Sequence, residues 1–488
     1  MKKKVLGLLL GTIFTVTGAL SMTACGGNGG GIDIDDDGNS IVTKEWWTTT
    51  GTLEKDANGK VEFNDVEVKL STVVAGEDKG YFNQIVEEFN ALYRGKITVI
   101  PTNIAENGFE DTIAKQISNN ETPPDLIMSH QKGHKSFVDS QLIQPFDETM
   151  ELSGITFDMK DYSDGLAKYS SLGFKDNLFS IPCDAQSSVV FYNKSIIGDK
   201  ALPTTHSELL TLCDEIAAEK NITPIAWATG SAGYLNYLFP TAIMQNGGTL
   251  YNTSSFYAEW DNEQNMSAFK NAIKSFRDLT TRKPKALAPI TQSNNEALNE
   301  FLYNRAAFYI TNPWDTKSLI SGYARINGIT EVEAKENFVG ATSTAGWFAI
   351  DENSSNAKKI YGDSHFFAMS KSVTDINVKA AICEFVKWFT GNGSAGAEWA
   401  EAGHVTASKV IAADTAYTEN EFVKNYISKF YPDINNFECT GNTPFFLPLR
   451  TYTGSIIVTA LANSTDASDE SIIKTAMKSF NGEVDFLK

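Results

Sequence analysis

Strand-like and helix-like segments alternate over residues 66–129, and this alternation constrains the fold more than any other feature of the chain. Val66, Val68 and Leu70 alternate with charged side chains, and residues 71–76 then run into a turn at Gly76, as a strand does when it ends. Phe82, Ile85 and Phe89 then follow at helical spacing. Residues 95–101 are again strand-like, 111–118 helix-like and 123–129 strand-like. This order predicts an α/β fold with a largely parallel sheet.

A second stretch of the same kind begins at 187–194 and continues through most of the remaining chain. Its expected helices cover 208–220, 266–279 and 376–391, and its expected strands cover 222–228 and 305–312. With 488 residues, of which 42% are hydrophobic, the chain can form one large or two medium domains. Residues 45–64 predict a hairpin-like appendage that turns at Asn58-Gly59, with Trp46 and Trp47 packing it onto the core.

The N-terminus has the pattern of an export signal. Three lysines precede an apolar stretch at 5–20 that is too short to span a membrane, so residues 1–24 are predicted to be a signal peptide. Met22-Thr23-Ala24-Cys25 resembles the lipobox of bacterial lipoproteins, in which cleavage exposes the cysteine for lipid attachment. The resemblance implies that Cys25 is lipidated and anchors the protein on the outer face of the cell membrane. An ordinary signal peptide with an incidental cysteine is the alternative.

Residues 25–44 are rich in glycine and aspartate, which predicts a flexible tether. The whole chain has a formal net charge of −19, and removal of the lysine-containing signal makes the mature protein more acidic still. Such a charge repels phosphate backbones and argues against a nucleic-acid partner. No metal-type cysteine spacing and no cofactor motif occurs, so we expect no cofactor, no metal and no essential disulfide. We also expect a monomer.

Several fragments carry a family resemblance through their order along the chain. They are PPDLIMSH (123–130), LFSIPCDAQSSVVFYNKSII (178–197), ALPTTHSELLTLCDEI (201–216), FLYNRAAFYITNPWD (301–315) and EWAEAGHVTASKV (398–410). In this order they resemble the extracellular solute-binding proteins of carbohydrate ABC importers. The resemblance implies a non-enzymatic protein that captures a sugar or oligosaccharide and delivers it to the transmembrane subunits of an ABC permease.

The same resemblance implies a periplasmic-binding-protein-like fold of two discontinuous α/β lobes joined by a hinge. We place lobe 1 at 65–186 and 360–403, and lobe 2 at 187–350 and 408–488. The hinge crossings are expected near 183–188, 350–362 and 403–408. Ligands in such sheets bind at loops beyond the strand ends, and closure by hinge bending is the expected motion.

A sugar ring presents an apolar face and an edge of hydroxyls, so it needs an aromatic platform and polar side chains. Trp314 follows Asn312-Pro313 at a strand end and matches the aromatic platform of the family, although packing at an interlobe seam is the alternative. Tyr234 and Tyr237 lie where the family has another stacking ring, and one of them is expected in the core. Phe445 and Phe446 correspond to a late aromatic platform.

Polar candidates cluster in the loops that follow the expected strands. Alone, such acids are usually solvated surface charges, and their position at strand ends favours a role in binding only modestly. The candidates are Glu77 and Asp78 after the first strand, Ser129, His130 and Gln131 after the third, Asp184 and Gln186 before the crossover strand, and His365.

Other functional classes fit the sequence less well. No G-x-S-x-G, Walker A or H-E-x-x-H motif occurs, but a glycosidase needs only two suitably spaced carboxylates and stays open. A metal-binding protein would use His130 and His134, which have helical ligand spacing but are interrupted by Gly133. A peptide-binding protein is a further alternative.

Overall fold

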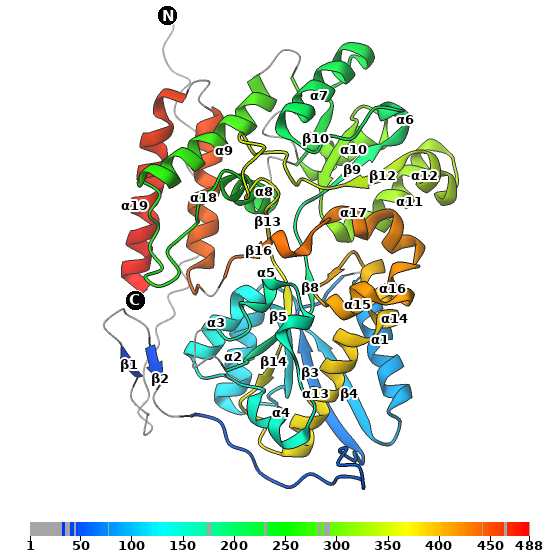
Figure 1. The fold of residues 1–488 in the computed structure, drawn as a ribbon, viewed down its shortest axis with the longest axis vertical. Helices are drawn as coiled ribbons and strands as arrows, with labels where there is room; N and C mark the ends of the chain where they lie inside the picture. Colours follow the sequence, from blue (N-terminus) through cyan, green and yellow to red (C-terminus); the bar gives the residue numbers. More distant parts are fainter. Residues whose placement is uncertain are drawn as a thin grey trace, which may run out of the picture.

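The structure is a computed structural model, and the chain folds into two lobes stacked along its long axis (Figure 1). The structure describes residues 32–34, 40–42, 45–76, 78–172, 177–228, 232–281, 285–286, 293–441, 443–462 and 466–487. The signal peptide and Cys25 lie outside these residues. Among the described helices, none combines the length and the apolar character that a membrane crossing requires.

Lobe 1 is built on a six-stranded sheet in the order β4-β3-β5-β14-β6, with β7 also paired to β14. β3 is parallel to β4 and β5, as the alternating pattern predicted, whereas β14 is antiparallel to its neighbours and makes the sheet mixed. The strands are β3 (Val66–Thr72), β4 (Ile97–Asn103), β5 (Leu126–His130), β6 (Ile143–Gln144), β7 (Ser180–Pro182) and β14 (His365–Ser370). The helices of this lobe are α1 (Asp78–Leu92), α2 (Phe109–Asn119), α3 (Gln131–Asp139), α4 (Asp147–Ser153), α5 (Asp164–Ala167), α13 (Ile376–Gly391) and α14 (Gly393–Glu401).

Lobe 2 is built on a four-stranded sheet in the order β10-β11-β9-β12. β10 and β11 are parallel, and β9 is antiparallel to β11 and β12. The strands are β9 (Val189–Asn193), β10 (Ile225–Trp227), β11 (Phe308–Thr311) and β12 (Val339–Thr342). The helices are α6 (Lys194–Ile197), α7 (His206–Lys220), α8 (Ala232–Gln245), α9 (Glu263–Thr281), α10 (Asn294–Leu302), α11 (Thr316–Asn327), α12 (Glu331–Asn337), α18 (Phe446–Ala462) and α19 (Asp469–Leu487).

Local sequence explains where these helices begin and end. Thr205 caps α7 by accepting the backbone N–H of Glu208, and Asn221 ends it in the left-handed conformation. In α13, Asp375 is the capping residue, and the predicted stripe, which includes Phe385 and Phe389, is buried. The helical predictions for both segments are therefore confirmed.

Short strand pairs connect the two lobes. β8 (Asp184–Ala185) pairs with β15 (Val405–Thr406), and β13 (Ile360–Gly362) pairs with β16 (Phe437–Cys439). A Cβ atom at Gly362 would lie 2.3 Å from the carbonyl oxygen of Gln186, so only glycine allows the crossing segments to approach this closely. These pairs lie within or beside the segments predicted to form the hinge.

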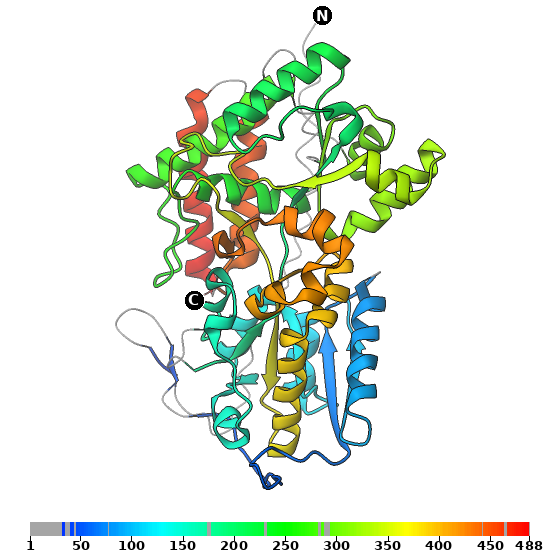
Figure 2. The same ribbon diagram turned by 45° about the vertical axis from the view of Figure 1, so that its right-hand side comes forward.

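The predicted assignment of all of 408–488 to lobe 2 is too simple. Helices α15 (Lys409–Ala413), α16 (Thr415–Thr418) and α17 (Ser428–Phe430) lie between the lobes, where Figure 2 shows them in orange. Their apolar residues share one buried cluster with Ala397 and Ala400 of α14 and with Phe191 of β9. This stretch therefore packs against both lobes, and α18 and α19 belong to lobe 2 alone.

The N-terminal appendage packs on lobe 1. Lys55 and Val61 form an antiparallel bridge, and the intervening turn has Gly59 at a φ of 78°. Trp46 stacks on Phe179 with ring centroids 5.8 Å apart and donates its indole N–H to the carbonyl of Ile143. The tryptophan therefore pins the appendage to the core, as predicted, and does not face the space between the lobes.

Candidate functional site

Two adjoining chambers lie in a cleft between the lobes. The first has a volume of about 420 Å³ and the second about 310 Å³, and they share Glu106, His130, Gln186 and Trp314. The first is otherwise lined by Val73, Val74, Ala75, Gly76, Asp78, Asp315, Ser318, His365 and His404. The second is otherwise lined by Lys132, Tyr237, Pro240, Leu250, Asn312, Tyr361, Phe446, Leu449, Arg450 and Thr453.

A larger groove of about 590 Å³ lies beside α11 and α12 and shares only Ser318 with the first chamber. Lysine, glutamate and serine side chains line much of it, and Phe422 is its one aromatic residue. The interlobe cleft gathers aromatic and polar groups from both lobes and the hinge, which is the composition expected of a small-molecule site. We therefore take the cleft as the candidate functional site.

Trp314 stands at the junction of the two chambers, as part of the short 3₁₀ turn Pro313–Asp315 that follows β11. Its backbone is held close to the hinge by Gly403. A Cβ atom at Gly403 would lie 2.5 Å from the carbonyl carbon of Pro313, and Gly403 has a φ of 102°. The half-buried Trp314 ring therefore projects into the cleft from a defined position.

Three of the five histidines of the chain line the first chamber. His130 ends β5 and His365 begins β14, and the antiparallel register places these two residues opposite each other. Their rings stack with centroids 4.7 Å apart. The third, His404, comes from the segment between α14 and β15 and stacks on Trp399 at 4.0 Å.

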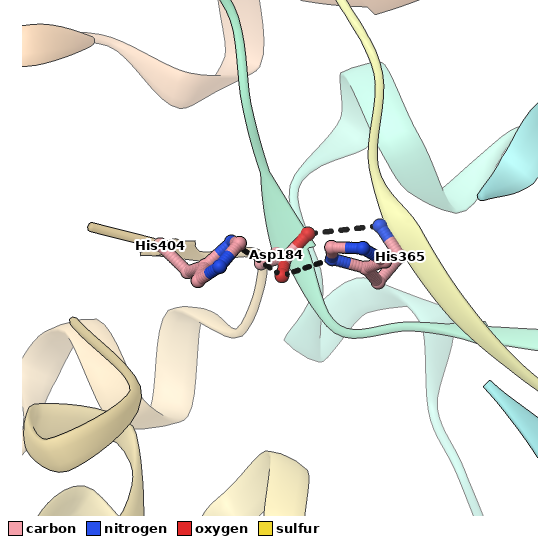
Figure 3. Close-up of side chains that lie close together, drawn as sticks. All are labelled: Asp184, His365 and His404. Atoms are coloured by element: carbon pink, nitrogen blue, oxygen red, sulfur yellow. Dashed lines mark hydrogen bonds and ion pairs between the residues drawn. The ribbon is translucent and has the colours of Figure 1, made fainter. Parts of the chain in front are cut away.

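Asp184 joins two of these histidines from the hinge (Figure 3). Its Oδ2 atom lies 2.8 Å from Nδ1 of His365 and 3.1 Å from Nδ1 of His404, and it accepts the indole N–H of Trp399 at 2.9 Å. Its Oδ1 atom accepts the backbone N–H of His365 at 2.8 Å. Asp184 is completely buried, so it orients the imidazoles and has no surface to offer a ligand directly.

This arrangement shifts the protonation of the cluster. Burial alone would raise the pKa of Asp184, but the neighbouring His365 and His404 hold it well below its usual value. Burial would likewise lower the pKa of His404, but Asp184 and Asp78 outweigh it and raise that pKa to about 9. His404 is therefore a cation near neutral pH, and its Nε2 atom lies 3.3 Å from Oδ2 of Asp78.

His130 behaves in the opposite way. Burial, followed by the positive charge of Lys132 and by His365, lowers its pKa well below the usual value, so it is neutral. Its Nδ1 atom lies 3.0 Å from Nε2 of Gln186. Because the Gln186 amide nitrogen can only donate, Nδ1 of His130 accepts and its Nε2–H is available to donate on the side of Glu106.

Lys132 carries a positive charge in the second chamber. Its Nζ atom lies 3.1 Å from Glu106 and 3.5 Å from Asp363, and 4.8 Å from the centroid of the Phe446 ring. Lys132 belongs to lobe 1 and Phe446 to lobe 2, so this cation–π contact crosses the cleft.

The structure brings part of the predicted site together. Trp314, His130, Gln186, His365 and Asp78 line the first chamber. Tyr237 and Phe446 line the second chamber with Trp314, His130 and Gln186. Glu77 lies outside the described residues, and so does the side chain of Tyr234, whose backbone is in the first turn of α8.

Four of the predicted ligand contacts do not face the cleft. Asp184 acts through the histidines, as described above. Ser129 is fully buried, and its hydroxyl lies 2.8 Å from Nε2 of His134 behind β5. Gln131 is fully buried in the first turn of α3. Phe445 is a core residue of lobe 2 that packs edge-on against Phe256, so Phe446 and not Phe445 faces the cleft.

Sequence reasoning missed His404, Glu106, Lys132 and Arg450. His404 lies inside the segment 403–408 that was predicted to cross the hinge, which was a usable signal. Arg450 lies four residues after Phe446, one helical turn away on the same face. Glu106 and Lys132 carried no comparable signal, because nothing in their local sequence separates them from solvated surface charges.

Asp184, His365 and His404 also have the residue types and spacing of a metal site, with ligand atoms within 4.8 Å of one another. Oδ2 of Asp184, however, already accepts the N–H of Trp399 and faces both imidazole nitrogens. Hydrogen bonds and ion pairs among these side chains therefore already engage Asp184, although Nδ1 of His404 has only the ion-pair contact with it. His130 and His134, the pair considered from the sequence, do not form such a group, because Nε2 of His134 contacts Ser129.

The two lobes, the hinge and the cleft define a ligand-binding protein of the periplasmic-binding type. The chain belongs to the bacterial extracellular solute-binding protein family, whose pattern matches residues 75–396. The predicted fold class and family are thereby confirmed. Members of this family, and the solved structures similar to this chain, are binding proteins rather than enzymes, and the family is extracytoplasmic.

Solved structures share the fold over nearly their whole length. The sugar-binding protein MalE of Xanthomonas citri matches with a TM-score of 0.67 and 14% identity, covering 86% of this chain and 99% of that one. The cyclic α-maltosyl-1,6-maltose-binding protein of Arthrobacter globiformis matches with a TM-score of 0.63 and 17% identity, covering 86% and 98%. The GacH receptor of Streptomyces glaucescens, solved with acarbose, matches with a TM-score of 0.62 and 16% identity, covering 85% and 97%. No curated protein sequence matches the chain.

Proposed function

We propose that this protein is the carbohydrate-binding component of an ABC importer, which captures a sugar or oligosaccharide between its lobes and delivers it to the permease. The observation that carries the proposal is the position of Trp314 between two chambers whose remaining walls are rich in polar groups. An indole ring covers the apolar face of a sugar, and the side chains beside it reach the hydroxyl edge. The similarity to a sugar-binding protein, to a cyclic maltosyl-maltose-binding protein and to a receptor solved with acarbose supports the same class of ligand.

Each polar group has a definite role in this proposal. Asp78 and Glu106 accept hydroxyl hydrogens, and the Nε2–H of His130 donates to a hydroxyl oxygen. His365 accepts through Nε2, because the ionised Asp184 at 2.8 Å keeps the proton on Nδ1. Asp184 is a positioning residue, which fixes the ring that a ligand would touch.

Capture works through closure of the lobes. Trp314 and Asn312 belong to lobe 2, and Asp78, Glu106 and His130 belong to lobe 1, so a ligand that contacts both groups stabilises the closed form. The permease then binds the closed, ligand-bound form in preference to the open form. The proposal includes a lipid anchor at Cys25 that keeps a monomeric protein at the outer face of the membrane.

Thermal-shift measurements over mono- and oligosaccharides, followed by calorimetry on the hits, test this function. We expect at least one carbohydrate to raise the melting temperature and to compact the protein in small-angle scattering. We further propose that the sugar is bound without turnover. Products in a chromatogram of sugar incubated with the protein would instead favour the glycosidase alternative.

A metal cargo is the second candidate, and the Asp184, His365 and His404 group is the observation in its favour. Zinc titration of the metal-free protein separates the two functions. The carbohydrate proposal predicts no saturable zinc binding that depends on His365 and His404, whereas a metal carrier would lose its binding when both are replaced by glutamine. Adding oligopeptides to the same thermal-shift screen tests the peptide alternative.

A further inference from the structure

Helix α18 presents one arginine to the second chamber. Phe446, Leu449, Arg450 and Thr453 all line this chamber, and their spacing places them on one face of the helix. Leu449 and Thr453 are buried and anchor this face, while Phe446 and Arg450 are only half-buried. The guanidinium of Arg450 is therefore carried by a packed helix rather than by a loop.

The guanidinium of Arg450 forms no hydrogen bond or ion pair with any residue in the described ranges of the chain. Other arginines differ from it in one of two ways. Arg277 pairs with Asp469, and Arg305 pairs with Glu300. Arg325 has no such partner either, but it is exposed to water on α11. Among these residues, Arg450 alone combines the absence of a partner with a place in the interlobe cleft.

The nearby charges do not neutralise Arg450. Lys132 is engaged with Glu106 at 3.1 Å and with Asp363 at 3.5 Å, and neither of these carboxylates forms an ion pair with Arg450. The Nζ atom of Lys132 also lies over the Phe446 ring from the opposite lobe, which brings a second positive charge to the same chamber. In contrast, the first chamber carries the carboxylates of Asp78 and Asp315 against the single cation of His404, and Glu106 borders both chambers. The cleft is therefore polarised along its length, with its cationic end at α18.

We infer that the second chamber receives a sugar unit bearing an anionic group, a carboxylate or a sulfate, and that Arg450 pairs with this group. This inference rests on the proposed function and specifies the class of sugar. A guanidinium presents a planar fork of N–H donors that matches two oxygens of such a group, and water exclusion on closure strengthens the pairing. Phe446 and Tyr237 supply aromatic surface beside the same unit.

Calorimetry with matched ligand pairs tests the inference. Trigalacturonate is compared with its methyl ester, and a sulfated oligosaccharide is compared with its desulfated form, each against the mature protein. Each member of a pair has the same rings and linkages, so the difference isolates the anionic group. We expect one charged member to bind roughly 10- to 100-fold more tightly than its neutral partner, the range for charge-assisted hydrogen bonds. The pair that shows this preference identifies the group as carboxylate or sulfate.

Three variants locate the preference. Arg450→Gln is expected to abolish the difference between charged and neutral members, and Arg450→Lys to retain part of it because the charge remains without the fork. Arg325→Gln removes the same charge from the surface of lobe 2 and is expected to leave the difference unchanged. The preference of the wild type should also weaken as salt is raised. Melting temperatures verify that all three variants are folded.

The outcomes separate this inference from the proposed function. If neutral sugars such as maltotriose bind and neither charged member does, or if charged and neutral members bind equally, the inference about Arg450 is wrong and the sugar-binding function stands. If Arg325→Gln removes the preference as fully as Arg450→Gln, the effect is one of net charge and the inference is again wrong. If no carbohydrate binds at all, the proposed function fails together with it.

Discussion

Lys317 of α11 lies over the ring of Tyr81 of α1, with Nζ 4.3 Å from the ring centroid. It also hydrogen-bonds the Tyr81 hydroxyl and pairs with Glu401 of α14 at 2.9 Å. Because α11 belongs to lobe 2 and Tyr81 to lobe 1, this contact joins the lobes. Together with the contact between Lys132 and Phe446, it stabilises the approach of the two lobes from two positions around the cleft.

Replacing Lys317 with alanine is expected to favour the open form. Lys317 is more than one-third exposed, so solvent screening limits its contribution to about 1 kcal/mol or less. Ligand affinity should fall by about two- to fivefold, and scattering of the unliganded protein should show expansion. Lys335→Ala, an exposed lysine on the neighbouring α12, is the control. Equal effects of the two variants would mean that Lys317 does not act on closure.

Trp314→Ala is expected to cost about 2–4 kcal/mol of ligand binding, as the loss of a hot-spot aromatic does. Its effect on stability should be smaller, because the ring is only half-buried. Phe445→Ala provides the opposite case. This residue is in the core of lobe 2, so its truncation should lower the free energy of unfolding by about 3–5 kcal/mol. Calorimetry and denaturant titration on both variants measure the contrast, and a Trp314 variant that loses stability but keeps affinity would identify a core residue.

Gly403→Ala is expected to displace the turn that carries Trp314. The added methyl group would lie within 2.6 Å of Pro313 and Trp314 backbone atoms, and the φ of 102° is unfavourable for alanine. Both affinity and melting temperature should fall. Gly391→Ala is the control, because a methyl group there meets nothing within 4 Å. An unchanged affinity for Gly403→Ala would show that the hinge does not position Trp314.

The pair formed by His404 and Asp184 predicts a pH dependence of stability. The pKa of His404 rises on folding from about 6.5 to about 9, so its contribution is fully present below about pH 6.5 and is lost as pH rises through about 9. The pKa of Asp184 falls on folding, so its contribution is lost as pH drops below its unfolded value of about 4. The stability advantage of the wild type over His404→Gln should therefore be largest between about pH 4 and 6.5 and shrink towards pH 10. Denaturant titrations across this range measure it, and a constant difference would contradict a charged His404.

Cys25→Ser tests the anchor. If Cys25 is lipidated, the variant should either remain unprocessed or leave the membrane fraction, because a serine offers no thiol for lipid attachment. Cell fractionation and the mass of the mature N-terminus report the result. Unchanged processing and membrane retention would show that another feature holds the protein at the membrane.

Local sequence was sufficient for the elements and for the family. The spacing of Phe82, Ile85 and Phe89 predicted α1, and all three are buried in the core of lobe 1. The ordered fragments predicted the two-lobed fold and the place of Trp314 beyond a strand. These features depend on periodicity and on short motifs, which can be read from neighbouring residues alone.

Which side chains face the cleft was decided by tertiary structure. Ser129 and His130 are adjacent in β5, so they point to opposite faces, and their sequence does not say which face borders the other lobe. Phe445 and Phe446 raise the same ambiguity at the start of α18. The Asp184 cluster joins residues from 184, 365 and 404, whose approach depends on hinge strands pairing across more than 200 residues. Local periodicity determines an element and its buried face, whereas the meeting of distant charges depends on how the lobes pack.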